Sequence, residues 1–450
     1  MQSQMGTITR DSVRGRRIPA ELTGVDPSLL YRKVLLRLLP MLLIVYIIAY
    51  IDRSNVGFAK LGFMRDLHFS DTVFGIGAGV FYAGYMIFEI PSNLMLARIG
   101  FRKTLLRIML LWALCSGLLA VMTGPNTYYF ARFLLGASEA GLFPGVLLYL
   151  TYWVPVSRRT RFTAAFMAAI PMSGVLGAPL SGFIMQNMEG LYGLSGWQWM
   201  FLIEGVPALL FAIVVFFAMK DRPASAPWLS PAERELIERD LEADRTRSKT
   251  GDHESFLDVL RTPRFYLLVG MGVALLASTS NVSFWLPTII QRSGVNNVWT
   301  IGLMGMAPYV VGVIAQQLVA RNSDIRNERR WHAAVCAATS AVGWCALPLV
   351  LNSPTLSLVA LTVTAGGTYA TMGPFWSMPS LYLSKQAAAG GIALISTLAG
   401  VGGLISPILI GWLNEYTKTL AAGQYFIAAL LIIGAATVVA MGPHEKNVIK

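Results

Sequence analysis

Charged residues are scarce in this 450-residue sequence: 13% of positions are Asp, Glu, Lys or Arg, whereas 55% are hydrophobic. This balance excludes a water-soluble globular enzyme, because soluble domains carry about 25% charged residues. The apolar stretches are also much longer than the alternating segments of about ten residues that build membrane barrels. A bilayer-spanning helix needs about 20 apolar residues, so the sequence predicts an all-α integral membrane protein.

Cysteine and histidine are nearly absent, with three and four residues respectively. The cysteines are Cys115, Cys336 and Cys345; they lie in apolar stretches without metal or disulfide spacing, and we interpret them as packing residues. The histidines fall in loops, at a helix end or in the tail, which excludes them as an intramembrane proton relay. The sequence contains no HExxH motif, Cys/His cluster or serine-nucleophile motif. We therefore predict no enzyme, no cofactor and no metal site.

Positive charge exceeds negative charge, giving a formal net charge of +12. In a soluble chain this excess would suggest nucleic acid, but here most Lys and Arg residues gather in the loops of one side, so we expect no nucleic-acid partner. The loops of the other side hold only Lys60, Arg65, Arg292 and Lys418. By the positive-inside rule, both termini are expected in the cytoplasm, with the protein in the cell inner membrane.

Hydropathy predicts twelve transmembrane helices in two six-helix bundles, at 34–220 and 264–442. A charged cytoplasmic linker, 221–263, separates the bundles, and we interpret it as a solvated connector with a short exposed helix. Cytoplasmic tails are expected at 1–33 and 443–450. The individual spans are expected near 34–56, 74–96, 104–123, 127–150, 162–187, 198–219, 265–290, 299–320, 332–351, 355–382, 387–413 and 421–442. A faint repeat across the linker favours two bundles around a central cavity. We expect the protein to be a monomer.

Ionisable residues inside the predicted spans are few, and nearly all belong to the first bundle: Asp52, Arg53, Glu89, Arg132, Glu139 and Glu204. An ionised side chain at the bilayer centre costs about 2.5–3.5 kcal/mol, so each is a candidate functional residue. Arg132 and Glu139 are seven residues apart and share one helix face. Asp52 and Arg53 point about 100° apart and must find partners on other helices. One arrangement pairs Asp52 with Arg132 and leaves Arg53 facing the cavity.

The charges of the central cluster balance, because two carboxylates accompany two guanidiniums. An anionic substrate would disturb this balance, and protonation of a carboxylate would restore it; desolvation favours that protonation. This charge balance predicts that at least one proton is transported for each negative charge of the substrate. Glu89 and Glu204 lie nearer to span ends, where water or backbone can partner them, and we interpret both as structural.

Several strings resemble the major facilitator superfamily, and more narrowly its anion:cation symporter family, in the branch with tartrate, phthalate and 4-hydroxyphenylacetate permeases. They are YIDRSNVGFA at 50–59, RFLLGASEAGLFPGVLLYLTYWVP at 132–155, GWQWMFLIEGVPALL at 196–210, SFWLPTII at 283–290 and PFWSMP at 374–379. This resemblance implies the major facilitator fold. It also implies a proton-coupled secondary active symporter that imports a small organic anion, a carboxylate, by alternating access.

The resemblance also implies roles for individual residues. The protonation sites of the family fall on Asp52 and Glu139, and the substrate-binding arginine falls on Arg53. The arginine that couples the two events falls on Arg132. Two further residues, Tyr50 and Trp376, match cavity-lining positions of the family.

The sequence departs from the family pattern in two places. The loop after the second span lacks the Gly and Asp of the superfamily motif, because Asn93 and Ala97 occupy their positions. In the eleventh span, where relatives often have asparagines, this chain reads ISTLAG at 395–400. A polyhydroxy sugar acid is therefore less favoured than a smaller or more aromatic carboxylate, for which Tyr369 and Trp376 could offer an apolar surface.

Two other readings remain open. An exporter or organic anion exchanger with the same fold is suggested by a run that resembles a motif of drug antiporters: Gly174, Gly177, Pro179 and Gly182. Buried acid and arginine residues suited to anions argue against it. A membrane-embedded enzyme or a non-transporting sensor is the third reading, and it would need a catalytic constellation.

Overall fold

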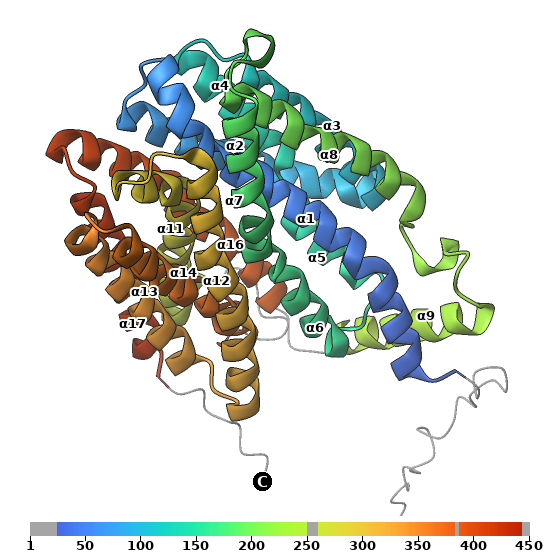
Figure 1. Ribbon diagram of the computed structural model, residues 1–450. Helices are drawn as coiled ribbons and strands as arrows, with labels where there is room; N and C mark the ends of the chain where they lie inside the picture. The colour runs from blue at the N-terminus through green and yellow to red at the C-terminus, as the bar shows by residue number, and fades with distance from the viewer. Residues whose placement is uncertain (1–24, 250–259, 383–386, 443–450) are drawn as a thin grey trace, which may run out of the picture.

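The computed structural model describes residues 25–249, 260–382 and 387–442, which fold almost entirely into helices. The predicted tail at 443–450 and most of the tail at 1–33 lie outside these residues. Two groups of helices follow each other along the chain, coloured blue to green and yellow to red in Figure 1. The predicted all-α architecture is confirmed.

The first bundle consists of six crossings, two of which are broken into two helices. Its helices are α1 (Pro27–Asp66), α2 (Asp71–Ile99), α3 (Phe101–Ala120), α4 (Pro125–Glu139), α5 (Leu142–Thr151), α6 (Val156–Met167), α7 (Ala169–Asn187) and α8 (Gly196–Ala218). The linker contributes α9 (Pro231–Lys249). The second bundle contains α11 (Pro263–Arg292), α12 (Val298–Arg326), α13 (Arg330–Val350), α14 (Pro354–Ser377), the short α15 (Pro379–Tyr382), α16 (Ala387–Thr417) and α17 (Ala421–Ala440).

Eleven helical segments among the described residues are long and apolar enough to cross a bilayer. The remaining predicted span corresponds to α14, whose 24 residues suffice for a crossing but include threonines and glycines that lower its hydropathy. The first helix begins at Pro27, earlier than the predicted residue 34, because the Asp26 side chain caps it by accepting from the Ser28 N–H. The chain is thus a multi-pass membrane protein.

Among the described residues, the main contacts between the bundles join α1 to α11, α2 to α16, and α7 to α12. The start of α1 and the end of α17 lie on the same side of the bundles as α9, which we call the α9 side (Figure 1). The other side is called the opposite side. Since the pairs join helices from both halves of the chain, the central site is built at the bundle interface.

Glycines bring the bundles into backbone contact towards the opposite side. A Cβ atom on Gly75 of α2 would lie 2.3 Å from the Pro407 carbonyl oxygen of α16. A Cβ atom on Gly57 of α1 would lie 2.6 Å from the Ser283 carbonyl oxygen of α11. Because real Cβ atoms do not approach so closely, only glycine permits this packing.

Ion pairs reinforce this contact at the ends of the helices. Asp71 at the start of α2 binds Lys60 of α1 at 2.8 Å and Arg292 of α11 at 3.6 Å. The Lys60 ammonium also lies 3.4 Å from the centroid of the Trp285 ring. The Thr72 N–H donates to Glu415 of α16 at 3.2 Å. The two bundles are therefore joined on the opposite side.

The linker helix α9 packs against the first bundle. The Tyr31 hydroxyl donates to Asp240 at 3.1 Å, and Lys33 forms an ion pair with Glu233 at 2.8 Å. Burial alone would raise the pKa of Glu233, but hydrogen bonds from Lys33 and the Ser230 N–H hold it below its ordinary value. The prediction of a solvated connector is thus incomplete: its described helix is attached to the first bundle.

Candidate functional site

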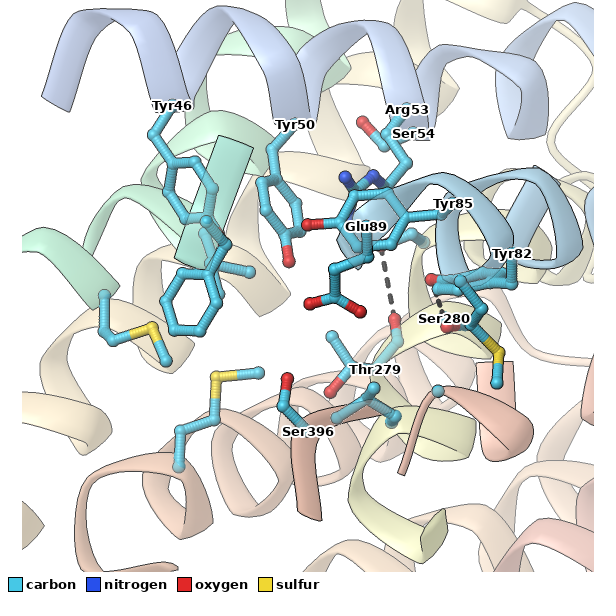
Figure 2. Close-up of a pocket in the computed structure, with 18 of the residues that line it drawn as sticks. Tyr46, Tyr50, Arg53, Ser54, Tyr82, Tyr85, Glu89, Thr279, Ser280 and Ser396 are labelled. Carbon is cyan, nitrogen blue, oxygen red and sulfur yellow. Dashed lines mark hydrogen bonds between the residues drawn. The ribbon is translucent and has the colours of Figure 1, made fainter. Parts of the chain in front are cut away.

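A cavity of about 100 Å³ lies between the bundles, towards the α9 side of their glycine contacts. This volume exceeds the roughly 10–15 Å³ that one water needs, so the cavity can take a compact ligand or several waters. Its walls carry many aromatic side chains, among them Tyr46, Tyr50, Tyr82, Tyr85, Phe143 and Trp376. Figure 2 shows that polar groups from both bundles face the same space. A mostly apolar wall with a few convergent polar groups is typical of a small-molecule site.

A charged contact at the cavity wall joins α1 to α4. Arg53 donates from Nη2 to Oε2 of Glu139 at 2.7 Å, and the Glu139 side chain has no exposed surface. The Arg53 guanidinium carbon also lies 4.6 Å from the Tyr50 ring centroid and 5.4 Å from that of Tyr85. Arg53 lines the cavity, whereas Glu139 lies behind it. The guanidinium is therefore shared between a buried carboxylate and the ligand space.

A second guanidinium lies close by. Both Arg53 and Arg132 approach the ring of Phe81, at 5.0 and 4.8 Å from its centroid. Arg132 is fully buried and donates from Nε to the Gly77 carbonyl at 3.3 Å. Its Nη1 and Nη2 atoms have no hydrogen-bond partner in the described part of the chain. Such a buried cation with unused donors is costly unless nearby charge compensates it.

Broken helices border the site. Glu139 is the last residue of α4, and α5 begins after Gly141, which has a φ of +85°. A Cβ atom on Gly141 would also lie 2.6 Å from Oγ of Ser92. The positive φ and this clash both require glycine at position 141. A second break separates α6 from α7, and Met167 and Ile170 on its two sides line the cavity. Discontinuous helices of this kind mark substrate sites in many transporters.

Asp52 points away from the cavity. Its Oδ1 accepts from Ser116 Oγ of α3 at 2.6 Å and from Asn55 Nδ2 at 3.4 Å, while Oδ2 has no partner among the described residues. The suggested pairing of Asp52 with Arg132 is wrong, because the ion pair of this cluster joins Arg53 to Glu139 instead. The 100° between adjacent helix positions explains this result, since it directs Asp52 to α3 when Arg53 faces α2 and α4.

The predicted aromatic residues are divided between the cavity and the core. Tyr50 and Trp376 line the cavity, and Trp376 lies 6.5 Å from Phe143 of the first bundle. Tyr369 is not among the lining residues: it is 1% exposed and packs against Tyr309 at 6.0 Å. In this conformation the structure thus brings Tyr50, Trp376 and Arg53 together around one space, without Tyr369.

Sequence reasoning missed the α2 wall of the cavity. Tyr82, Tyr85 and Glu89 all line it, and their spacing of three and four residues puts them on one helix face. Tyr82 shares a 2.6 Å hydrogen bond with Ser280 of α11. Glu89 accepts from Thr397 of α16 at 3.2 Å, so its interpretation as a purely structural residue omitted its place in the cavity. The periodic polar positions in an apolar helix were the signal available in the sequence.

The buried acid Glu204 lies outside the cavity. Glu204 of α8 accepts from Ser181 of α7 at 2.7 Å and is not a lining residue of the cavity. Within the described residues, no group of three or more His, Cys, Asp or Glu side chains is placed to hold a metal ion. The polar chemistry of the cavity therefore rests on Arg53, Glu89, tyrosines and hydroxyl groups.

Two helical bundles with a ligand-sized cavity at their interface, glycine contacts on one side of it and broken helices beside it, define a membrane transporter rather than an enzyme. The chain belongs to the Major Facilitator Superfamily, whose family model matches residues 42–407. It is thus a transporter of small organic substrates.

Known relatives agree with this assignment over most of their length. A candidate tartrate transporter of Agrobacterium vitis is 43% identical over 404 residues, covering 90% of this chain and 89% of that protein. A quinolone resistance transporter of Acinetobacter baumannii is 38% identical over 405 residues, covering 90% and 92%. Among solved structures, a D-xylose-proton symporter superposes with a TM-score of 0.74 at 15% identity, covering 91% and 98%. That structure supports the fold alone.

Proposed function

We propose that this protein is a proton-coupled symporter that imports a small organic anion, a carboxylate, by alternating access. The observation that carries the proposal is the ion pair between Arg53 and Glu139 at the cavity wall. Arginine binds carboxylates through a planar pair of N–H donors. A substrate carboxylate that enters the cavity competes with Glu139 for the same guanidinium.

This competition provides the proton coupling. The Oε1 atom of Glu139 has no hydrogen-bond partner among the described residues. Once the substrate has taken Arg53, the ionised Glu139 is left buried without its ion-pair partner as well. Breaking a buried ion pair in this way costs about 3–5 kcal/mol. Protonation of Glu139 removes that cost by neutralising the side chain. One proton is therefore carried with one substrate carboxylate, and a proton gradient can drive accumulation.

Asp52 and Arg132 extend the same system. Asp52 is the neighbour of Arg53 on α1, and Arg132 lies about two turns before Glu139 on the same face of α4. We assign Asp52 as a second protonation site and Arg132 as the cation that couples the two acids. The Nη1 and Nη2 atoms of Arg132 have no hydrogen-bond partner among the described residues, so they can donate to a carboxylate when Arg53 is engaged by substrate. Protonation of Asp52 or Glu139 then alters the electrostatic environment of the other acid.

Orientation follows from the loop charges. We assign the α9 side and both termini to the cytoplasm of the cell inner membrane, and the side with Asp71 to the cell exterior. In this conformation the contacts of Gly57, Gly75 and Asp71 then close the path between the cavity and the cell exterior. We further propose that the monomer is the transporting unit, because both bundles that form the cavity belong to this chain.

The relative from Agrobacterium vitis supports an anionic substrate, because tartrate is a carboxylate. The relative from Acinetobacter baumannii favours a second candidate, an organic anion exporter or exchanger with the same fold. The glycine run of α7 at the bundle interface also fits that candidate: a Cβ atom on Gly182 would lie 2.9 Å from the Val298 carbonyl oxygen of α12. The ion pair between Arg53 and Glu139 serves either direction of transport.

Proteoliposomes distinguish these functions. Purified protein is first screened by thermal shift against small mono- and dicarboxylates, and a stabilising compound is then used in radiolabelled form. Import with protons predicts uptake against the substrate gradient when the outside is made acidic, and its loss when a protonophore is added. Uptake that occurs only when the vesicles are preloaded with substrate would contradict symport and support exchange.

A further inference from the structure

Glu89 is a buried carboxylate that the proposed coupling does not use, although it faces the ligand. It belongs to α2, one turn beyond Tyr85, and is 7% exposed. In Figure 2 its carboxylate points into the cavity, on the same side of α2 as Tyr82 and Tyr85. Its hydrogen bond from Thr397 holds it at the junction of the two bundles.

The Glu89 carboxylate has no cationic partner in residues 25–249, 260–382 and 387–442, since none of the ion pairs there includes it. Arg53, the cation of the cavity wall, is bound to Glu139 instead. A buried acid without a countercharge is retained at a cost in stability. A ligand group that complements Glu89 would offset this cost when it binds.

The cavity therefore has two poles. Arg53 lies 5.4 Å from the Tyr85 ring centroid, and Glu89 follows Tyr85 by four residues, a rise of about 6 Å along α2. Tyrosine and tryptophan rings line the same cavity. A ligand that places a carboxylate on Arg53 extends across the aromatic wall and presents its far end to Glu89.

From this arrangement, and resting on the carboxylate site proposed above, we infer that Glu89 is a specificity-determining residue. It binds an ammonium or other hydrogen-bond donor at the far end of an aromatic monocarboxylate. A second carboxylate at that end would meet Glu89 as a like charge and be rejected. The preferred substrates are thus compact amphoteric acids rather than dicarboxylates.

Three benzoates that differ only at the para position test this inference: 4-(aminomethyl)benzoate, its near-isostere 4-ethylbenzoate, and terephthalate. Binding to the full-length protein is measured by titration calorimetry. We expect the wild-type protein to bind 4-(aminomethyl)benzoate at least tenfold more tightly than 4-ethylbenzoate, and to bind terephthalate weakest. In Glu89→Gln, which keeps the side-chain size, the ratio should fall to about one, and terephthalate should gain affinity.

Glu204→Gln is the matched control, because it makes the same change at a buried acid outside the cavity; it should keep the wild-type ratio. A wild-type ratio near one, a ratio that survives in Glu89→Gln, or no binding of any benzoate would each overturn the inference. Arg53→Ala tests the proposed function separately, since it should weaken all ligands alike. If Arg53→Ala binds them as the wild type does, the proposed function fails.

Discussion

Arg53 of α1 and Glu139 of α4 form a 2.7 Å ion pair at the place where α4 ends and the chain turns through Gly141. The guanidinium faces the cavity while the carboxylate is fully enclosed. The negative end of the α4 dipole also favours a cation at this point. One side chain thus belongs to both the ligand space and the buried charge cluster, and the predictions below follow from this double role.

Changes at Arg53 should weaken substrate binding. A charge-assisted hydrogen bond contributes about 1.5–3 kcal/mol, and each 1.4 kcal/mol is a factor of about ten in affinity. Arg53→Lys keeps the charge but loses the planar donor pair, so we expect roughly 10- to 100-fold weaker binding of a carboxylate in calorimetry. Arg65→Lys, at an exposed site outside the cavity, serves as the control. Equal affinity of Arg53→Lys and the wild type would contradict the assigned role.

Glu139→Gln should separate binding from proton coupling. The amide cannot release or take up a proton, so uptake driven by an acidic exterior should be lost in proteoliposomes, while exchange of labelled for unlabelled substrate continues. Glu204→Gln, which neutralises a buried acid away from the cavity, should still accumulate substrate. The assignment is wrong if Glu139→Gln concentrates substrate normally.

Two glycines should respond differently to an added methyl group. Gly57→Ala places Cβ 2.6 Å from the Ser283 carbonyl oxygen of the other bundle, a clash that separation of the bundles relieves. Gly136→Ala places Cβ 1.9 Å from the Phe81 carbonyl oxygen within the first bundle, where no such motion helps. We expect Gly57→Ala to fold and favour the outward-open state, and Gly136→Ala to lose most folded protein in size-exclusion chromatography.

The separation is measured by electron–electron spin resonance between labels on His68→Cys and Asn296→Cys, in a background without the native cysteines. These positions lie in loops of different bundles on the opposite side. Gly57→Ala should shift the distance distribution to longer values. An unchanged distribution together with full activity would show that the Gly57 contact does not close the outer side.

Asp71→Asn should weaken the contact between the two bundles on the opposite side by removing ion pairs. The change removes the countercharge of both Lys60 and Arg292, and it leaves Lys60 close to the Trp285 ring without its carboxylate partner. The labels at positions 68 and 296 should again report a larger outward-open population. If the double change of Asp71 and Gly57 opens the protein no further than either change alone, the two contacts act as one closure.

The sequence was sufficient for the helices and for the residues of the charge cluster, because long apolar runs and isolated ions inside them are local patterns. The partners of those ions depend on packing between helices. From the sequence, Asp52 and Arg53 were expected only to find partners on other helices. The arrangement of α1, α3 and α4 pairs Asp52 with Ser116 and Arg53 with Glu139. This is why the suggested contact between Asp52 and Arg132 was wrong.

The far wall of the cavity was missed for a related reason. Glu89 was judged by its distance from the end of a span, but its environment is set by Thr397, more than 300 residues later. Tyr369 was expected in the cavity because it precedes Trp376 by seven residues on the same helix. It packs against Tyr309 instead and does not line the cavity. Side-chain direction at a bundle interface could not be predicted from either half alone.

We propose that a substrate carboxylate displaces Glu139 from Arg53 and that a proton binds with it. Titration calorimetry in buffers of different ionisation enthalpy measures this proton directly. The slope of binding enthalpy against buffer enthalpy gives the protons taken up per ligand. We expect uptake of about one proton by the wild type near neutral pH and a marked reduction in Glu139→Gln. Tight binding with no proton uptake in the wild type would contradict it.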